Sequence, residues 1–158
     1  MKNFTRLAVM VCMFGAFSAC KKKKDEVKPE ETAVVHGKVY SKDFTMVSGR
    51  AITDNYNNNE RVVVNLSANS TFNCSSPETA YSVYFRVPKK AGKYTQASSD
   101  IWLGFNDSPS DTSVGFVSDD CLVEITSVSN GRCTGKISFA DQPSGSSVSG
   151  TFDVPFCQ

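Results

Sequence analysis

The chain has 158 residues, of which 17 are lysine or arginine, 16 are aspartate or glutamate and 6 are cysteine. This balance of charge argues against a nucleic-acid partner, which would call for a strongly basic face. Residues 32–158 are numerous enough for one domain with a genuine hydrophobic core, and they contain no evident internal repeat.

The N-terminus has the three parts of a secretory signal. A basic start is followed by an apolar stretch over residues 7–17, which is too short to span a bilayer. The next motif, FSAC at residues 17–20, resembles the lipobox of bacterial lipoproteins. The resemblance implies cleavage before Cys20 and lipidation of that cysteine. We therefore expect residues 1–19 to be a signal peptide.

Residues 20–31 are predicted to form a charged, flexible tether. Four lysines follow Cys20 directly, and the segment has no apolar periodicity. Anionic lipid attracts a lysine at the headgroup level by roughly 1 kcal/mol. The alternative is a solvated spacer that its charge keeps extended. Both interpretations agree with a domain held at a membrane by a lipid anchor.

Apolar and polar residues alternate with period two through most of residues 32–158, which is typical of half-buried strands. Turn-forming residues separate these runs, and no stretch of ten residues has a helical stripe. The sequence therefore predicts an all-β domain of nine or ten short antiparallel strands, as a β-sandwich or a partly closed barrel. The residues expected on its buried face include Val62, Val64, Leu66, Val83, Phe85, Val87, Ile101, Leu103, Phe105, Val148, Phe152, Val154 and Phe156.

The clearest unit is a hairpin over residues 121–139, with an Asn-Gly turn signal in its middle. A two-residue loop would set Val123 against the polar Ser138. A three-residue loop over residues 129–131 sets Val123 against Ile137 and keeps the apolar residues on one side. We prefer this longer loop, because a consistent buried face fixes strand register.

Four segments resemble a family of small Bacteroidetes outer-membrane lipoproteins with an all-β domain of unknown function. They read GKVYSKDF, VPKKAGKYT, VEITSVSNGRCTGKISF and VSGTFDVPFC, within residues 33–158. The resemblance implies a β fold and an envelope location. In that phylum, acids just after the lipid cysteine resemble a surface-export signal, and Lys24-Asp25-Glu26 is similar to one. We therefore expect an outer-membrane protein, and we prefer the cell-surface face to the periplasmic one.

Cys74, Cys121, Cys133 and Cys157 remain after Cys20, and an even number in an exported chain favours disulfides. A regular hairpin separates Cys121 from Cys133 by roughly 20 Å along the ladder, too far for a bridge. Of the two full pairings left, we prefer Cys133–Cys157 with Cys74–Cys121, because the last strand is expected to pair with residues 133–140. The other alternative is a single Cys74–Cys157 bridge with two buried free thiols. No pair has the close spacing of zinc ligands.

Other polar residues offer little support for an enzyme. His36 is expected to face solvent, and no nucleophile is marked as its partner. Asp119-Asp120 is expected in a solvated turn. Residues 54–60 supply oxygen atoms without the calcium-loop spacing. We therefore predict a protein that is not an enzyme and that needs no metal or cofactor.

Three aromatic residues carry the functional hypothesis. Tyr40, Tyr84 and Trp102 alternate away from the core-facing residues of their own strands, and exposed aromatic clusters often mark binding sites. We predict a non-catalytic binding module for a glycan, a peptide or a small ligand, anchored to the membrane through Cys20. The alternative is a structural or accessory lipoprotein that interacts with a larger outer-membrane complex. A covering loop or sheet would remove the exposed aromatic surface.

Overall fold

The computed structural model describes residues 33–55, 60–77, 82–95, 101–106, 113–116 and 121–158. The expected signal peptide and tether, with Cys20, lie outside the described residues. So do Asp119, Asp120 and residues 56–59 of the loop after Asp54.

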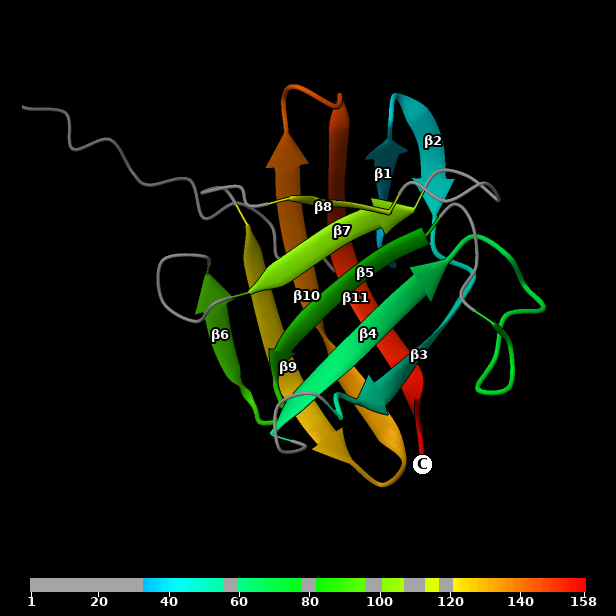
Figure 1. The fold of residues 1–158 in the computed structure, drawn as a ribbon, viewed down its shortest axis with the longest axis vertical. Coiled ribbons are helices and arrows are strands. Elements are labelled where there is room, and N and C mark those ends of the chain that lie inside the picture. The colour runs from blue at the N-terminus through cyan, green and yellow to red at the C-terminus, as the bar shows by residue number, and fades with distance from the viewer. Residues whose placement is uncertain (1–32, 56–59, 78–81, 96–100, 107–112, 117–120) are drawn as a thin grey trace, which may run out of the picture.

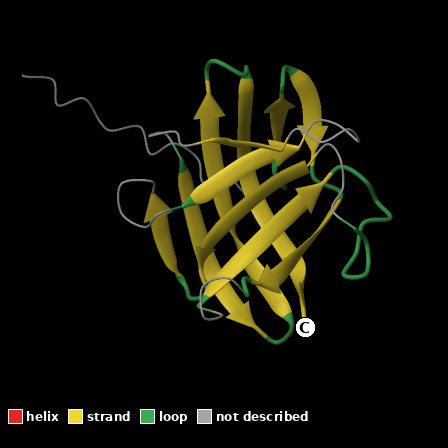
Figure 2. Cartoon of the chain, viewed as in Figure 1, coloured by secondary structure: helices red, strands yellow, loops and turns green. Residues whose placement is uncertain are grey.

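The described residues form eleven strands and no helix, which confirms the all-β prediction (Figure 2). The strands are β1 (His36–Val39), β2 (Lys42–Thr45), β3 (Ser48–Thr53), β4 (Arg61–Ser67), β5 (Ser82–Pro88), β6 (Gly92–Thr95), β7 (Trp102–Asn106), β8 (Ser113–Phe116), β9 (Leu122–Ser129), β10 (Arg132–Asp141) and β11 (Ser146–Cys157).

The strands form one curled, open sheet. Its hydrogen-bonded order is β6-β9-β10-β11-β3-β4-β5-β7-β8, and β1 pairs with both β11 and β2. Figure 1 shows β3, β4, β5, β7 and β8 crossing in front of β9, β10 and β11. We call the first group the front layer, and β6, β9, β10 and β11 the back layer.

The layers are joined by the one parallel pairing among the described strands, which the prediction of a purely antiparallel fold missed. Phe156 and Cys157 of β11 pair in parallel with Ala51 and Ile52 of β3. The topology explains the direction. β1 is antiparallel to β11, and β2 is antiparallel to β1. β2 therefore runs parallel to β11, and β3 continues its course after a two-residue link.

The core lies between the inner faces of the two layers. Ring contacts cross it, with centroids 5.4 Å apart for Phe85 and Phe152 and 5.0 Å apart for Phe105 and Phe139. The core-facing residues predicted from alternation are buried, except that Phe156 is only partly buried. Period-two patterning thus identified the core correctly, because each strand buries one face.

The hairpin of β9 and β10 has the predicted register over most of its length. Val123 lies opposite Ile137, and Ile125 lies opposite Gly135. The next strand also pairs as expected, because β11 runs antiparallel to β10 from Arg132 to Asp141. The consistent buried face therefore selected the correct pairing.

The turn of this hairpin differs from the prediction. Ser129 pairs with Arg132, so the loop has two residues, Asn130 and Gly131, with φ angles of 52° and 69°. Such angles are those of the turn type that Asn-Gly favours in two-residue hairpins. The register then shifts by one residue at Thr126, the extra residue of a β-bulge. The predicted three-residue loop is wrong, and the bulge supplies the shift instead.

The disulfide joins Cys74 to Cys157, whose Cα atoms are 5.6 Å apart. The preferred pairing of Cys133 with Cys157 and Cys74 with Cys121 is therefore wrong, and the single-bridge alternative is the one the structure has. Cys121 and Cys133 are free and buried. Alternation explains the choice. Val154 of β11 points into the core, so Cys157, three residues later, points outward, where the loop carrying Cys74 passes.

Candidate functional site

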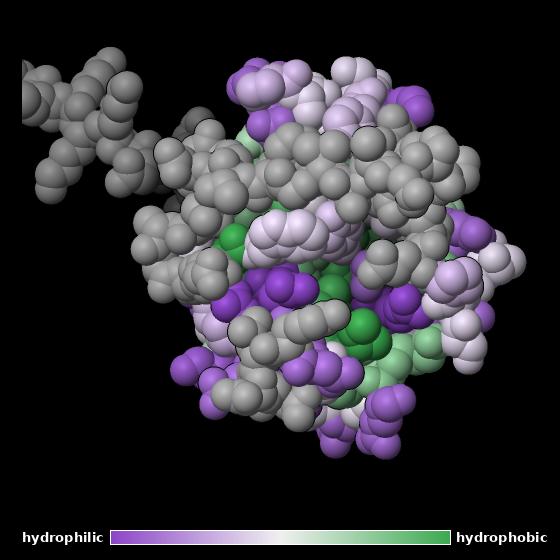
Figure 3. Space-filling model, viewed as in Figure 1, coloured by the Kyte–Doolittle hydropathy of each residue, from purple (hydrophilic) through white to green (hydrophobic). Residues whose placement is uncertain are grey.

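The outer face of the front layer has its side chains in register across four strands. The pairing aligns one row over β3, β4, β5 and β7, made of Ile52, Val63, Arg86 and Trp102. The adjacent row is made of Arg50, Asn65, Tyr84 and Gly104. Figure 3 shows this face, where hydrophobic atoms lie beside strongly hydrophilic ones. We call these two rows the front face.

Trp102 is the largest exposed side chain of the front face. It is 38% exposed, and its ring centroid lies 4.8 Å from that of the half-buried Tyr84. Gly104, opposite Tyr84 on β7, makes this contact possible, because a Cβ there would collide with the Tyr84 ring. The phenol thus lies across β7, supports one side of the indole and leaves Trp102 partly open to solvent.

An ion pair adjoins the indole. Nε of Arg86 lies 2.7 Å from Oδ2 of Asp54, and the Asp54 side chain is only 2% exposed. The Arg86 guanidinium lies 5.7 Å from the centroid of the Trp102 ring, within cation–π range. Neither charged residue was predicted from the sequence as part of this site. Arg86 could have been found, because it lies two residues after Tyr84 and therefore on the same face of the strand. No local pattern in the sequence links Asp54 to β5.

Tyr40 lies away from this pair, contrary to the expected three-residue platform. It occupies the turn between β1 and β2 with a φ of 49°. Its ring meets Phe105 edge-on at 6.4 Å and packs against the core. The strand ends at Val39, so the alternation that placed Tyr40 on an outer face no longer applies. The structure therefore brings together Tyr84 and Trp102 only.

Arg50 fixes a loop beside the front face. It is 7% exposed, and its Nη1 donates to the carbonyl oxygens of Asn73 at 3.2 Å, Cys74 at 3.3 Å and Ser76. Phe72 lies under the guanidinium, 4.8 Å from it. The loop after β4 is therefore held by a buried cation as well as by the disulfide.

The free thiols have a structural role in this arrangement. Burial raises the pKa of Cys121 to about 11, and burial together with the charge of Asp153 raises the pKa of Cys133 to about 11. A thiol with such a pKa is protonated at neutral pH and is a poor nucleophile. Both cysteines therefore behave as small core residues.

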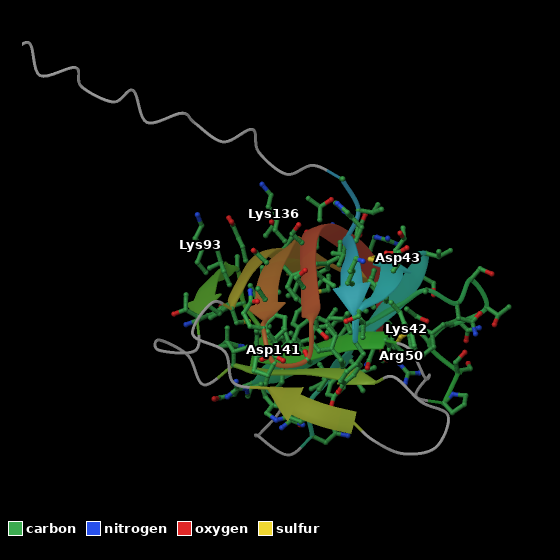
Figure 4. The ribbon with its side chains drawn as sticks, turned by 90° about the horizontal axis from the view of Figure 1, so that it is seen from above. Lys42, Asp43, Arg50, Lys93, Lys136 and Asp141 are labelled. Carbon is green, nitrogen blue, oxygen red and sulfur yellow. A yellow bond between two sulfur atoms is a disulfide. The ribbon has the colours of Figure 1, made fainter. Side chains whose placement is uncertain are left out.

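A shallow groove of about 490 Å³ lies on the outer face of the back layer. Exposed Val34 and Val47 form part of its wall, with Met46 beside them, while Thr134 and Thr151 lie along β10 and β11. Figure 4 shows Lys93 and Lys136 pointing away from the core on this same side of the molecule. The groove is apolar at one wall and polar along its strands.

His36 is exposed, as predicted, and its Nδ1 lies 2.9 Å from the carbonyl oxygen of Val34. No group of three or more histidine, cysteine, aspartate or glutamate side chains gathers as metal ligands within the described ranges. Among the residues that the structure describes, no helix has the length and apolarity to cross a membrane.

Comparison of the chain with protein-family models, with curated proteins and with solved structures finds no match. The front face must therefore be interpreted from its own geometry.

Proposed function

We propose that this protein is a lipid-anchored envelope protein whose β domain is a non-catalytic binding module. Its ligand binds at the front face, and a glycan fits best among the glycan, peptide and small-ligand classes. The observation that carries the proposal is the partly open indole of Trp102, supported by Tyr84 and Arg86 on neighbouring strands.

The chemistry of the front face suits a sugar ring. The apolar face of a pyranose packs on an aromatic side chain, while its hydroxyl groups need donors and acceptors nearby. Trp102 offers the aromatic surface, and Arg86 offers guanidinium donors beside it. Rigid strands carry both side chains, so little conformational entropy is lost on binding.

We prefer a binding role to a catalytic one because the carboxylate beside the site is already paired with an arginine. The front face carries aromatic rings, and the carboxylate next to it, that of Asp54, forms an ion pair with Arg86. General acid–base chemistry needs a group that can exchange a proton with a bound substrate. We propose that Asp54 instead orients Arg86.

The proposed setting is the outer membrane, with the domain tethered through Cys20. The first described residues, Ala33 and Val34, lie beside β11. The carbonyl oxygen of Ala33 accepts a hydrogen bond from the backbone N–H of Thr151, and Val34 forms an isolated parallel β-bridge with Thr151. The tether would leave the domain there. We also propose that the curled sheet acts as a partly closed barrel, because one hydrogen-bonded path runs from β6 through β11 to β8.

The test uses Trp102, the one tryptophan of the chain, in the full-length protein purified in detergent. We expect its fluorescence to be red-shifted, readily quenched by acrylamide and altered by a binding oligosaccharide from a glycan array. Trp102→Ala should abolish binding and cost little stability, about 0.5 kcal/mol. Leu122→Ala is the matched control, since Leu122 is 39% exposed on the back layer.

A blue-shifted, unquenchable emission together with a stability loss of about 3–5 kcal/mol in Trp102→Ala would contradict the proposal. Unchanged glycan binding by that variant would contradict it as well.

The second candidate function is that of an accessory lipoprotein that contacts another envelope protein. Exposed Val34 and Val47 beside the back-layer groove favour it. Val47→Ser should weaken such a contact without affecting Trp102 fluorescence. Crosslinking in intact cells would test it, and an unchanged crosslinking pattern for Val47→Ser would argue against this role for the groove.

A further inference from the structure

The front face carries an excess of positive charge among the described residues. Arg50 and Arg86 belong to the front face and alternate away from buried neighbours on β3 and β5, and Arg61 begins β4 beside them. β3, β4 and β5 contain no carboxylate among their described residues; Asp54 directly follows β3, and exposed Glu60 directly precedes β4. Residues 32–158 as a whole hold ten basic and twelve acidic side chains. The arginines therefore give this face a positive charge, although residues 32–158 as a whole hold more acidic than basic side chains.

A ligand at Trp102 meets the cation rather than the carboxylate. The Asp54 side chain is 2% exposed, whereas the Arg86 side chain is 33% exposed. The ion pair uses Nε of Arg86, and a guanidinium has two further nitrogens that donate hydrogen bonds. Asp54 thus pairs with Arg86 at Nε, and the two Nη nitrogens are the donors that we assign to the ligand.

Arg86 also disfavours a cationic ligand. Its guanidinium already lies over the Trp102 ring at 5.7 Å, and a second cation on that ring would meet like charge. Buried Arg50 adds positive potential from the adjacent row, since its Nη1 donates to neutral carbonyl oxygens. Both effects favour an anionic group next to the indole.

We propose that the ligand is an acidic saccharide, a sugar ring that carries a carboxylate or a sulfate. This inference rests on the proposed function of the front face. The ring packs on Trp102, and its anionic group accepts hydrogen bonds from Arg86. Arginine suits this role better than lysine, because its planar fork matches the two oxygens of a carboxylate or sulfate.

The experiment compares matched probes by titrating Trp102 fluorescence in the full chain in detergent. The probes are an oligomer of galacturonic acid, the methyl ester of the same oligomer and a sulfated oligosaccharide. We expect an acidic probe to bind at least about 10-fold more tightly than the ester, since hydrogen bonds to charged groups are the stronger ones. The preference should weaken as salt rises. The acidic probe that binds more tightly shows whether the anionic group of the ligand is a carboxylate or a sulfate.

Variants connect the preference to Arg86. Arg86→Gln should remove the difference between the acidic oligomer and the ester, and Arg86→Lys should reduce it. Because Arg86→Gln removes a cation that pairs with the buried Asp54, the double variant Asp54→Asn with Arg86→Gln provides a second test with the pair removed together. Arg132→Gln is the matched control, since Arg132 forms an exposed ion pair with Asp153 on the back layer.

Equal affinity for the acidic oligomer and its ester would overturn this inference and leave the binding module intact. A preference that survives in the Arg86 variants would overturn it too. Failure of every saccharide to change Trp102 fluorescence would instead overturn the proposed function.

Discussion

Nη1 of Arg50 lies 3.3 Å from the carbonyl oxygen of Cys74, so a buried cation of β3 and a disulfide to β11 hold the same loop. The guanidinium also binds the carbonyl groups of Asn73 and Ser76. The loop is therefore fixed by two independent devices, one of which survives reduction.

Replacing Arg50 should destabilise the domain even with the disulfide intact. Arg50→Met keeps most of the length of the side chain but removes three hydrogen bonds, so the carbonyl groups of Asn73, Cys74 and Ser76 lose their donor. We expect the free energy of unfolding to fall by about 2–4 kcal/mol in urea denaturation. Arg132→Met is the control and should change it by no more than about 1 kcal/mol. Equal effects of the two substitutions would contradict a special role for Arg50.

Peptide mapping without reduction should recover Cys74 linked to Cys157. The double variant Cys74→Ser with Cys157→Ser should lose about 2–4 kcal/mol of stability, because the bridge spans 83 residues of sequence. Cys121→Ala serves as the comparison, since it leaves the bridge in place. A peptide linking Cys133 to Cys157 would contradict the structure directly.

Stability should fall as the pH rises above 9. The pKa of both free thiols is about 11 in the folded protein and close to 9 when they are exposed by unfolding. Between these values the unfolded state releases protons that the folded state retains, so alkaline pH favours unfolding. Urea denaturation from pH 7 to pH 10.5 measures the slope. The double variant Cys121→Ala with Cys133→Ala should flatten it, and an unchanged slope would show that other groups cause it.

Gly104 and Tyr84 should be energetically coupled. Gly104→Ala places a methyl group where the Tyr84 ring lies, and overpacking of this kind costs about 1–3 kcal/mol. In a Tyr84→Ala background the same substitution should cost much less, because the ring is gone. A double-mutant cycle measures the coupling. Additive effects would mean that the contact contributes nothing to stability.

Cys20→Ser tests the anchor. The lipobox resemblance implies that this variant is released from the membrane or remains an uncleaved precursor. Fractionation of cells followed by mass measurement of the protein distinguishes these outcomes from wild-type behaviour. Normal processing and normal membrane association of Cys20→Ser would contradict the proposed lipid anchor.

Alternation of polar and apolar residues predicted the core well, because each strand buries one face whatever its partners are. The same pattern said little about where strands end. It carried Tyr40 past Val39 onto an outer face, although the residue lies in a turn and its side chain packs, partly buried, against the core. It also placed a register shift in the loop of the β9–β10 hairpin, whereas a bulge at Thr126 produces it.

Long-range pairings were harder to predict from the sequence. The Asp54–Arg86 ion pair and the Cys74–Cys157 bridge join segments whose proximity depends on strand order. The parallel contact of β11 with β3 has no local signal either, because it follows from the direction of β1 and β2. Two of the three residues expected in the aromatic platform, Tyr84 and Trp102, lie together as the sequence predicted, but their charged neighbours were not predicted.

The position of β11 governs when the chain can fold. This strand hydrogen-bonds to β10 on one side and to β1 and β3 on the other. Neither layer has its complete set of neighbours until residues 146–157 are available, and the Cys74–Cys157 bridge cannot close earlier. The complete sheet therefore cannot form until almost the whole chain has been made.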